Sequence, residues 1–316
     1  MIRISAEIVW AVTQQKDFWT SLADHMAVVL RQQAAGESTA SPRQIIRTKK
    51  GDGLGVMAAI TVQMSTPIMG VKLVSLALQA PQNGPSHPGV VILIDPHSGE
   101  PLASLDADAV TAVRTAATTC AVTRQLRPEG FRFTMIGTGI EARSHLLALS
   151  AAFPEARFTI WGRRSDGAEA IANEYVSQGI AVRAEPDLVE AMKGAEIITS
   201  VTSATSPFLN TRHLLRRAHI NAVGASIPGL AEWAPESFRA MDILICDNIE
   251  ECRRQSEEIP NDLLDNARTA ASILGRLSTA QDLSDERTVY KSVGSAVLDV
   301  AASAFLLERM RSSSQL

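Results

Sequence analysis

Residues Arg132 to Ala142, RFTMIGTGIEA, decide the fold of this chain. A short apolar run ends in a glycine-rich turn, and a helical pattern begins directly after it. In the pattern Gly-x-Gly-x-x-Ala, the first glycine allows the tight turn and the second lets backbone N–H groups approach a pyrophosphate. The alanine lets the helix pack closely on its strand, and the helix N-terminus supplies a positive end. The stretch from Phe131 to Val201 is therefore predicted to be a dinucleotide-binding βαβ unit.

The residues of this turn form the first predicted cofactor contacts. Glycine turns also make purely structural strand-to-helix connections, but here a second apolar strand follows and ends at Gly162, as a βαβ unit requires. The residues predicted to contact the dinucleotide at the turn are Gly137, Thr138, Gly139, Ile140 and Glu141.

The end of that second strand indicates which dinucleotide is bound. NAD enzymes usually place an Asp or Glu about 20 residues after the turn, where it binds the ribose hydroxyls. Here the sequence has Arg163 and Arg164 and no carboxylate. A guanidinium can form a charge-assisted fork with a 2′-phosphate, so NADP(H) is favoured and NAD(H) is the alternative. Two solvated loop arginines are the simpler explanation of the same residues.

The sequence before and after Arg132 shows two different patterns of apolar residues. After Arg132, short apolar strands alternate with helical patterns, which predicts an α/β class with a Rossmann-type, doubly wound parallel sheet. Before it, apolar runs broken by Pro and Gly predict an N-terminal mixed α+β domain. The runs are Gly55–Ile60, Gly70–Leu78 and Gly89–Asp95. A long apolar helix, predicted over Tyr290–Arg309, crosses back to the first domain. The predicted domains are residues 1–118 with 296–316, and residues 119–295.

Composition excludes several classes of function. The chain has 316 residues, with 30 Lys and Arg against 34 Asp and Glu, and no dense basic run, so nucleic acid is not an expected partner. The start, MIRISAEIVWAV, lacks the pattern of a signal peptide, and no segment reaches the roughly 18 apolar residues of a membrane span, so a cytoplasmic protein is expected. The three cysteines and six histidines show no metal-ligand spacing, so no metal is expected.

Three basic residues lie among apolar or small neighbours: Arg43 in SPRQII, Lys72 in GVKLVSL and Arg114 in TAVRTAATT. A buried cation is costly unless it meets an anion, which is either a protein carboxylate or a ligand. Each residue taken alone is more often a snorkelling or ion-paired structural residue. Arg114 is the strongest candidate, because the alanines around it make its helix face small enough for a ligand to approach.

The chain resembles the ornithine cyclodeaminase/μ-crystallin family over nearly its full length. The resemblance rests on the segments PRQII, LGVMAA, MGVKLVSL, DPHSGEPLASLDADAVTAVRTAATT, GTGIEARSHL, HINAVGAS-x-P and VYKSVGSAVLDVA. It implies a homodimer, in which an N-terminal substrate-binding and dimerisation domain is completed by the C-terminal helix. The substrate, a small amino or imino acid, lies between this domain and the Rossmann domain.

The resemblance also assigns roles to individual residues. Those matching Arg43, Lys72 and Arg114 hold the α-carboxylate of an amino or cyclic imino acid, in agreement with three cations that need an anion. Besides the glycine turn, the residues expected to line the cofactor are Thr115, Thr202 with the loop to Thr205, Ser292, Val293 and Gly294.

Two positions depart from the cyclodeaminases of the family. Those enzymes have an aspartate that binds and deprotonates the substrate's side-chain amine, whereas this chain has Ser226 in the matching segment. They also have a glutamate that helps to activate water, where this chain has Gly55. A serine supplies no negative charge and is no base near neutral pH. Both changes remove groups needed to eliminate ammonia, so simple redox chemistry is favoured.

The sequence therefore predicts an NAD(P)H-dependent oxidoreductase that acts on the C=N carbon of a cyclic ketimine such as Δ1-pyrroline-2-carboxylate or Δ1-piperideine-2-carboxylate. Arg43 and Arg114 would clamp the carboxylate, and Lys72 would polarise the substrate and help to protonate the imine nitrogen. Ser226 would hydrogen-bond the ring nitrogen, although a structural serine after a strand explains it equally well. The similar ketimine reductases of the family also have serine here and prefer NADPH.

Three alternatives stay open. An ornithine cyclodeaminase would convert ornithine to proline and release ammonia, and an amino-acid dehydrogenase would produce a 2-oxo acid. A protein of a different class would hold NADPH or a small ligand without catalysis, as μ-crystallin-like proteins are reported to do. Ammonia release and turnover of an imine discriminate among these alternatives.

Overall fold

The computed structural model describes residues 1–49, 52–63, 66–76, 88–275 and 283–312. The chain divides into two compact units, which are described separately. Unit 1 is Met1–Ala117 with Ser295–Leu316, and unit 2 is Thr118–Gly294. The assignment of substrate and dinucleotide binding to these parts stays a prediction.

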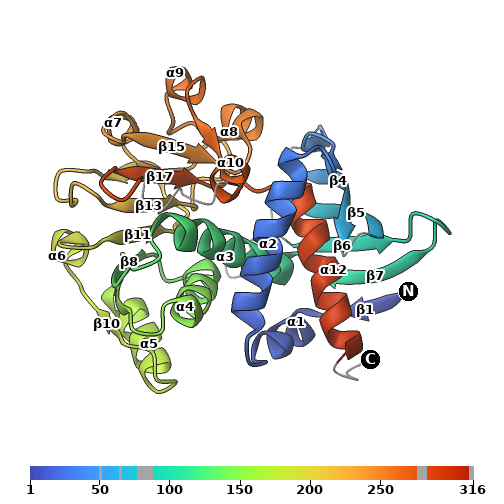
Figure 1. Ribbon diagram of the computed structural model, residues 1–316, viewed down its shortest axis with the longest axis horizontal. Helices are drawn as coiled ribbons and strands as arrows, with labels where there is room; N and C mark the ends of the chain where they lie inside the picture. The colour runs from blue at the N-terminus through green and yellow to red at the C-terminus, as the bar shows by residue number, and fades with distance from the viewer. Residues whose placement is uncertain (50–51, 64–65, 77–87, 276–282, 313–316) are drawn as a thin grey trace. The chain divides into compact units, whose positions relative to one another are not determined.

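Unit 1 is built on one mixed sheet with helices on one face (Figure 1). Its strand order is β1-β7-β6-β5-β4-β2, with β3 also paired to β4, and only the β1–β7 pair among the described pairs is parallel. The strands are β1 Ile2–Ile4, β2 Thr39–Ala40, β3 Gln44–Arg47, β4 Gly53–Gln63, β5 Thr66–Leu76, β6 Gly89–Ile94 and β7 Pro101–Asp106. The last two residues of the predicted strand Gly70–Leu78 lie outside the described residues.

Two long helices cover the sheet of unit 1. Helices α2 (Phe18–Ala34) and α12 (Ala296–Ser312) pack against each other and against β4, as the blue and red helices of Figure 1 show. Helix α12 packs very closely at one point, because a Cβ atom at Gly70 would lie 2.8 Å from a methyl carbon of Val300. The smaller helix α1 (Ala6–Thr13) precedes α2, and α3 (Ala107–Leu126) runs on from unit 1 into unit 2.

The predicted helix over Tyr290–Arg309 was wrong at its start. Tyr290 belongs to strand β17 (Thr288–Lys291), and the helix begins only at Ala296. The β-branched and aromatic residues of this stretch suit a buried central strand, and Gly294 turns the chain with a φ of 77°. The apolar residues after Gly294 have helical spacing, and the strand before it is also apolar. The sequence analysis therefore joined the strand and the helix into one predicted helix.

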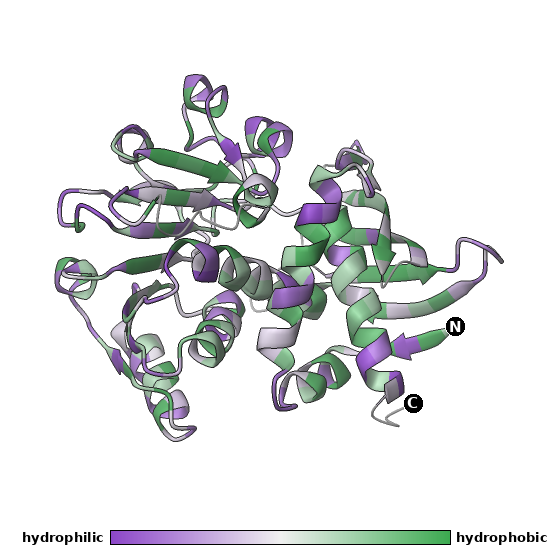
Figure 2. Ribbon diagram, in the orientation of Figure 1, coloured by the Kyte–Doolittle hydropathy of each residue, from purple (hydrophilic) through white to green (hydrophobic). Residues whose placement is uncertain are grey.

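Unit 2 contains a parallel sheet of eight strands in the order β10-β9-β8-β11-β13-β17-β15-β16. These strands are β8 Arg132–Ile136, β9 Arg157–Trp161, β10 Val182–Ala184, β11 Ile197–Ser200, β13 His219–Ala222, β15 Ile243–Cys246, β16 Arg268–Thr269 and β17. The central strands appear largely green in Figure 2, as expected for strands that are buried on both faces. The predicted α/β class, with a Rossmann-type sheet and an N-terminal mixed domain, is confirmed.

The order of the strands reverses once in this sheet. From β8 the chain winds outward through β9 to β10, then returns to β11 on the other side of β8. Besides the end of α3, the helices in the described part of unit 2 are α4 Ile140–Ala152, α5 Ser165–Val176, α6 Leu188–Met192, α7 Pro235–Arg239, α8 Ile249–Gln255, α9 Asn261–Leu264 and α10 Ala270–Leu274. A small two-stranded sheet pairs β12 (Thr205–Leu209) with β14 (Ala231–Trp233). Ligands of open α/β sheets bind beyond the carboxyl ends of the strands at such a switch point.

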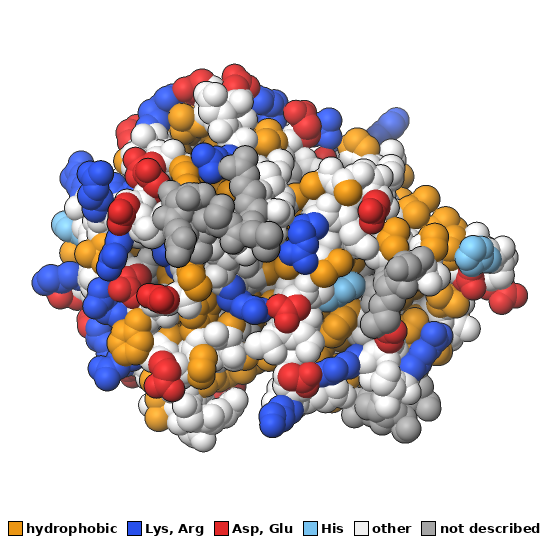
Figure 3. All heavy atoms as spheres, in the orientation of Figure 1, with side chains coloured by type: hydrophobic (Ala, Val, Ile, Leu, Met, Phe, Trp, Pro, Cys, Tyr) orange, Lys and Arg blue, Asp and Glu red, His pale blue; other side chains and the backbone are white. Residues whose placement is uncertain are grey.

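The surface shows no division by charge on the face drawn in Figure 3, where basic and acidic side chains are interspersed. A search of the described helices for one both long enough and apolar enough to cross a membrane found none.

Candidate active site

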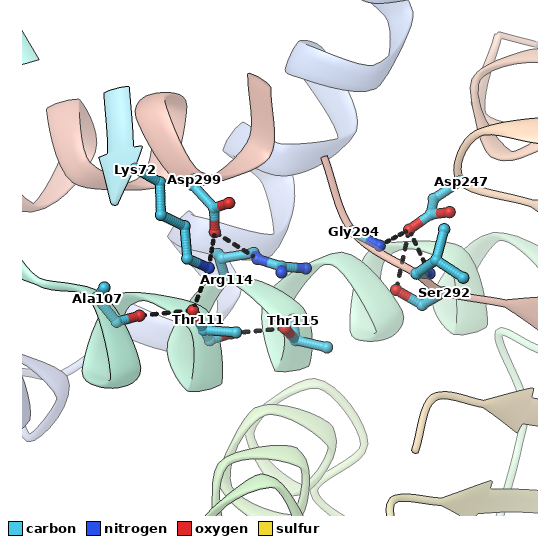
Figure 4. Close-up of polar contacts among 10 residues, drawn as sticks. Lys72, Ala107, Thr111, Arg114, Thr115, Asp247, Ser292, Gly294 and Asp299 are labelled. Atoms are coloured by element: carbon cyan, nitrogen blue, oxygen red, sulfur yellow. Dashed lines mark hydrogen bonds and ion pairs between the residues drawn. The ribbon is translucent and has the colours of Figure 1, made fainter. Parts of the chain in front are cut away.

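Lys72 lies on the helix-covered face of the sheet of unit 1. Alternate residues of a strand point to the same face, so Lys72 shares its face with Gly70, which contacts α12. Its side chain is only 3% exposed, and Nζ donates to Oγ1 of Thr111 at 2.5 Å and to Oδ1 of Asp299 at 3.2 Å (Figure 4). The predicted cation is thus buried and bonded to a carboxylate of the protein.

Arg114 reaches the same carboxylate from helix α3. Its Nε donates to Oδ1 of Asp299 at 2.9 Å, and Thr111 lies three residues earlier, on the same side of the helix. The Thr111 hydroxyl accepts from Lys72 and donates to the carbonyl oxygen of Ala107. Thr115, predicted to line the cofactor, is buried and donates from Oγ1 to the carbonyl oxygen of Thr111. One oxygen of Asp299 is therefore shared by two cations.

Asp299 was not predicted as a site residue. It lies on α12 and is almost fully buried among apolar neighbours. The criterion that singled out Arg114, a charged residue flanked by core-like residues, applies equally to Asp299 in the segment AVLDVAA. Applied to acids as well as to bases, it would have found this partner.

The electrostatics of this cluster favour an anion. Burial lowers the pKa of the Lys72 ammonium, the charge of Asp299 raises it, and the nearby charges of Arg114 and Arg43 lower it further. Burial alone would raise the pKa of Asp299, but the two cations and their hydrogen bonds outweigh this and hold it below its usual value. The structure thus brings Lys72 and Arg114 to one carboxylate, with Arg43 close enough for its charge to act on Lys72.

The glycine turn of unit 2 has the geometry that a pyrophosphate requires. Gly137 has a φ of 128°, and a Cβ atom there would lie 3.1 Å from the carbonyl oxygen of Val201. Gly139 precedes the first turn of α4, and a Cβ atom there would meet nothing within 4 Å. Ala142 is fully buried. The turn therefore combines an open helix N-terminus with a close strand-to-loop approach, which fits a dinucleotide.

The two arginines lie beside this turn. Arg163 and Arg164 follow β9 directly and are exposed, and a Cβ atom at the preceding Gly162 would come within 2.5 Å of a methyl carbon of Thr138. Arg164 forms a long ion pair of 3.9 Å with Asp166, and both side chains are mostly exposed. The position suits recognition of a group on the ribose near the turn.

The other predicted residues of unit 2 follow parallel strands of the same sheet. Thr202 follows β11, Ser226 follows β13, and the segment Ser292–Gly294 follows β17. Since the strands are parallel, all of these residues lie at the same edge of the sheet as the glycine turn. The structure therefore gathers the predicted cofactor residues of unit 2, while Thr115 belongs to unit 1.

Comparison with known proteins assigns the chain to a family. A model described as the ornithine cyclodeaminase/mu-crystallin family matches residues 7–314. The chain belongs to this family. It is 33% identical to the ketimine reductase mu-crystallin of Rattus norvegicus over 270 residues, which cover 84% of this chain and 83% of the relative. The predicted family is thus confirmed.

Solved structures of similar fold cover almost the whole of this family member. The Δ1-pyrroline-2-carboxylate reductase of Thermococcus litoralis, in complex with NADH and L-proline, matches with a TM-score of 0.86 and 22% identity over 99% of this chain and 98% of that one. An archaeal alanine dehydrogenase dimer with bound NAD matches with a TM-score of 0.83 and 23% identity over 99% and 97% of the two chains. Family membership and the similarity to a ketimine reductase confirm the predicted class of enzyme, an NAD(P)-dependent oxidoreductase.

A buried acidic network at the carboxyl edge of the sheet was missed by the sequence analysis. Asp247 accepts hydrogen bonds from Oγ of Ser292 and from the backbone N–H groups of Val293 and Gly294, so it shapes a predicted cofactor loop (Figure 4). Glu258 accepts from Nζ of Lys291 at 2.6 Å. An acid at the end of a strand is too common for its position alone to have identified either carboxylate.

Glu232 completes this network and connects two loops. Its carboxylate accepts from the backbone N–H of Thr202 and of Gly224 and from the hydroxyl of Ser200. No grouping of three or more His, Cys, Asp or Glu side chains suited to a metal ion occurs in the part of this family member that the structure describes. The acidic residues at this edge instead accept hydrogen bonds from backbone N–H groups of the surrounding loops.

Proposed function

We propose that the chain is an NADPH-preferring reductase of cyclic 2-imino acids, of the type of Δ1-pyrroline-2-carboxylate and Δ1-piperideine-2-carboxylate. The observation that carries the proposal is the shared carboxylate, Asp299, on which two buried cations, Lys72 and Arg114, converge. The free-energy cost of burying these cations falls when the anionic group of a substrate binds beside them. The similarity to a ketimine reductase supports the choice of an imine.

Arg114 and Arg43 would hold the substrate carboxylate. Arg114 is bound to Asp299 through Nε, and a guanidinium carries further N–H donors in the planar fork geometry that matches a carboxylate. Arg43 is close enough for its charge to lower the pKa of Lys72, and it would add a second positive charge at the carboxylate. Fixing the carboxylate orients the C=N bond next to it.

Lys72 would supply the proton to the imine nitrogen. Burial and the neighbouring arginines lower the pKa of Lys72, which makes its ammonium a stronger acid, while the charge of Asp299 opposes this shift. Ser226 is the predicted hydrogen-bond partner of the ring nitrogen. When bound, the reduced nicotinamide supplies the hydride, and the protein supplies orientation and charge.

The preference for NADPH rests on Arg163 and Arg164. Both side chains are exposed beside the glycine turn. Neither position has the carboxylate that would bind the ribose hydroxyls of NAD(H). A 2′-phosphate there would bring negative charge to two guanidinium groups.

One set of assays tests the function. Oxidation of NADPH and NADH is followed with a panel of cyclic ketimines, and ornithine with NAD is assayed for ammonia. We expect turnover of at least one ketimine, faster with NADPH, and no ammonia. Ammonia from ornithine would indicate the cyclodeaminase, a 2-oxo acid from an amino acid would indicate the dehydrogenase, and cofactor binding without turnover would indicate a binding protein.

We also propose a homodimer formed by the sheet of unit 1. The face of β4 opposite to Lys72 carries Leu54 and Ile60, which are 40% and 48% exposed, and Ile46 beside Leu54 on β3 is 62% exposed. A continuous apolar sheet face of this kind marks an interface. A second copy is the favoured occupant, because the similar alanine dehydrogenase is a dimer.

The mass in solution tests the dimer. Light scattering should give twice the chain mass, and the single variant Ile60→Asp should give the monomer mass. A dimer that survives this substitution would exclude this face as the interface.

A cytoplasmic location is proposed as well, since the three buried free thiols fit a reducing compartment.

A further inference from the structure

Glu232 makes an unusual set of hydrogen bonds for one buried side chain. It lies on β14 and is fully buried. Its Oε1 accepts from the backbone N–H of Thr202 at 2.6 Å, while Oε2 accepts from Oγ of Ser200 at 2.8 Å and from the backbone N–H of Gly224 at 3.0 Å. Both oxygens are therefore engaged with donors from two separate strand ends.

The two strand ends are neighbours at the carboxyl edge of the parallel sheet. Thr202 follows β11 and Gly224 follows β13, and the two strands pair directly. The loops approach so closely that a Cβ atom at Gly224 would lie 2.2 Å from the carbonyl oxygen of Thr202 and 2.6 Å from Cδ of Glu232. Only glycine fits at this position, so the carboxylate and the two loops form one tightly packed junction.

This junction lies on one side of the switch point. The glycine turn follows β8, and β11 is the neighbour of β8 on the side opposite to β9. A dinucleotide that binds across a switch point places one half over each side. With the adenosine ribose at Arg163 and Arg164 after β9, the nicotinamide half falls on the side of β11 and β13.

We propose that Glu232 is a positioning residue for the nicotinamide half of the dinucleotide, acting through the loops at Thr202 and Gly224. The proposal rests on the proposed function. A carboxylate is required, because two oxygens must accept from three donors, whereas an amide offers one acceptor and turns an N–H group toward a backbone N–H. The loop that begins at Gly224 also carries Ser226, so the same side chain fixes the predicted substrate contact.

The charge of Glu232 makes this role sensitive to pH. Burial raises the pKa of Glu232, and the N–H of Thr202 together with the charge of Lys291 lower it only in part. Lys291 on β17 is itself bonded to Glu258, and Glu258 also accepts from the backbone N–H of Glu232, so a second carboxylate lies close to the first. When the pH falls, Glu232 takes up a proton and loses acceptor capacity, so dinucleotide binding should weaken.

The experiment compares Glu232→Gln with the wild type by calorimetric titration of NADPH between pH 5.5 and 8.5, together with kcat and the KM for imine. We expect the Kd for NADPH to rise about tenfold at pH 8. A change of this size corresponds to the loss of about one buried hydrogen bond. The wild-type Kd should rise toward low pH, and the variant should show a weaker rise, because only the titration of the 2′-phosphate remains; a merely structural defect would shift both ends of the profile equally.

Glu196→Gln is the matched control. Its carboxylate also accepts two backbone N–H groups, those of Phe131 and Arg132 at 2.9 and 3.0 Å, but at the opposite edge of the same sheet. We expect its Kd for NADPH to stay within about twofold of the wild type, since no ligand contact depends on that edge. Equal losses in the two variants would overturn the positioning role.

Ser200→Ala serves if Glu232→Gln does not fold. It removes one donor to Glu232 and keeps the carboxylate, so a rise of about threefold in the Kd is expected, and an unchanged Kd would overturn the proposal. A wild-type protein that binds neither NADPH nor NADH would overturn the proposed function and this inference together. Equal NADPH affinity of the wild type and Glu232→Gln would overturn the inference alone.

Discussion

In unit 1 two cations share one carboxylate, whereas in unit 2 one of three buried carboxylates, Glu258, is paired with a lysine. Lys72 and Arg114 both bond to the same oxygen of Asp299. In the acidic network of unit 2, Glu258 accepts from Lys291, and all three carboxylates, Asp247, Glu232 and Glu258, accept from backbone N–H groups of the loops around them. Both groups are buried, so neither is a solvated surface feature.

The difference indicates which group is built for a ligand. Backbone N–H groups and Lys291 together bind the buried carboxylates of unit 2, so this network has its partners within the protein. In unit 1 the described ion pairs set two cations against one carboxylate, an arrangement that favours the approach of a further anion. The cations of unit 1 should therefore act on a ligand, and the carboxylates of unit 2 should act on loops.

Removal of a cation from unit 1 should affect catalysis most. We expect Arg114→Met to lower kcat/KM for the imine by about 10³-fold or more, because the bidentate contact to the substrate carboxylate is lost. The melting temperature should change little, since Asp299 keeps Lys72 as a partner. Steady-state kinetics and thermal unfolding measure the two effects. Near-wild-type kinetics would refute the carboxylate clamp.

Removal of the cation from unit 2 should affect stability instead. Lys291→Met leaves the buried Glu258 without its ion-pair partner, which should cost about 3 kcal/mol of unfolding free energy. Denaturant unfolding measures this loss. The double variant Lys291→Met/Glu258→Gln removes both charges and should recover most of the stability. A single variant as stable as the wild type would show that the two groups do not differ as described.

The shared carboxylate should also set the pH range of activity. Asp299 raises the pKa of Lys72, so Asp299→Asn should lower that pKa. If the Lys72 ammonium is the proton donor, activity is lost above its pKa, and the alkaline limb of the kcat/KM profile should move to lower pH by about one unit.

A neutral control separates charge from hydrogen bonding at Lys72. Thr111→Val removes the other bond of the Lys72 ammonium but no charge, so the alkaline limb should shift less than in Asp299→Asn. An alkaline limb that stays in place, or moves to higher pH, in Asp299→Asn would contradict the role of Lys72 as the acid.

Much of the fold was readable because local pattern and tertiary structure agree. The run RFTMIGTGIEA forms the predicted strand, turn and helix, since its strand is buried on both faces and its glycines meet real steric demands. The exception is Tyr290, whose strand is short and leads within a few residues into a helix of similar composition. The cost of burying a bare cation also indicated Lys72 and Arg114, because that cost depends only on the charge and on the apolar residues beside it in the sequence.

The partners of these residues could not be read in the same way. Asp299 is 227 residues from Lys72 in sequence, and only the packing of α12 on the sheet brings them together. Glu232 carries no local signal, because a single acid before a tryptophan is compatible with an exposed loop. Its importance comes from the pairing of β11 with β13, which is a property of the sheet order.

The smallest effect is expected outside both buried groups, at the exposed arginines. Arg163→Asp replaces a positive charge beside the glycine turn with the carboxylate that NAD enzymes place there, so it should repel a 2′-phosphate and accept from a ribose hydroxyl. Exposed charge contacts are worth about 1 kcal/mol or less, so the ratio of NADPH to NADH activity should fall about fivefold. Arg157→Asp, also exposed but at the amino end of β9, is the control and should leave the ratio unchanged. An unchanged ratio in Arg163→Asp would remove the argument for NADPH, while the charge contrast between the two buried groups would stand, because it depends on neither arginine.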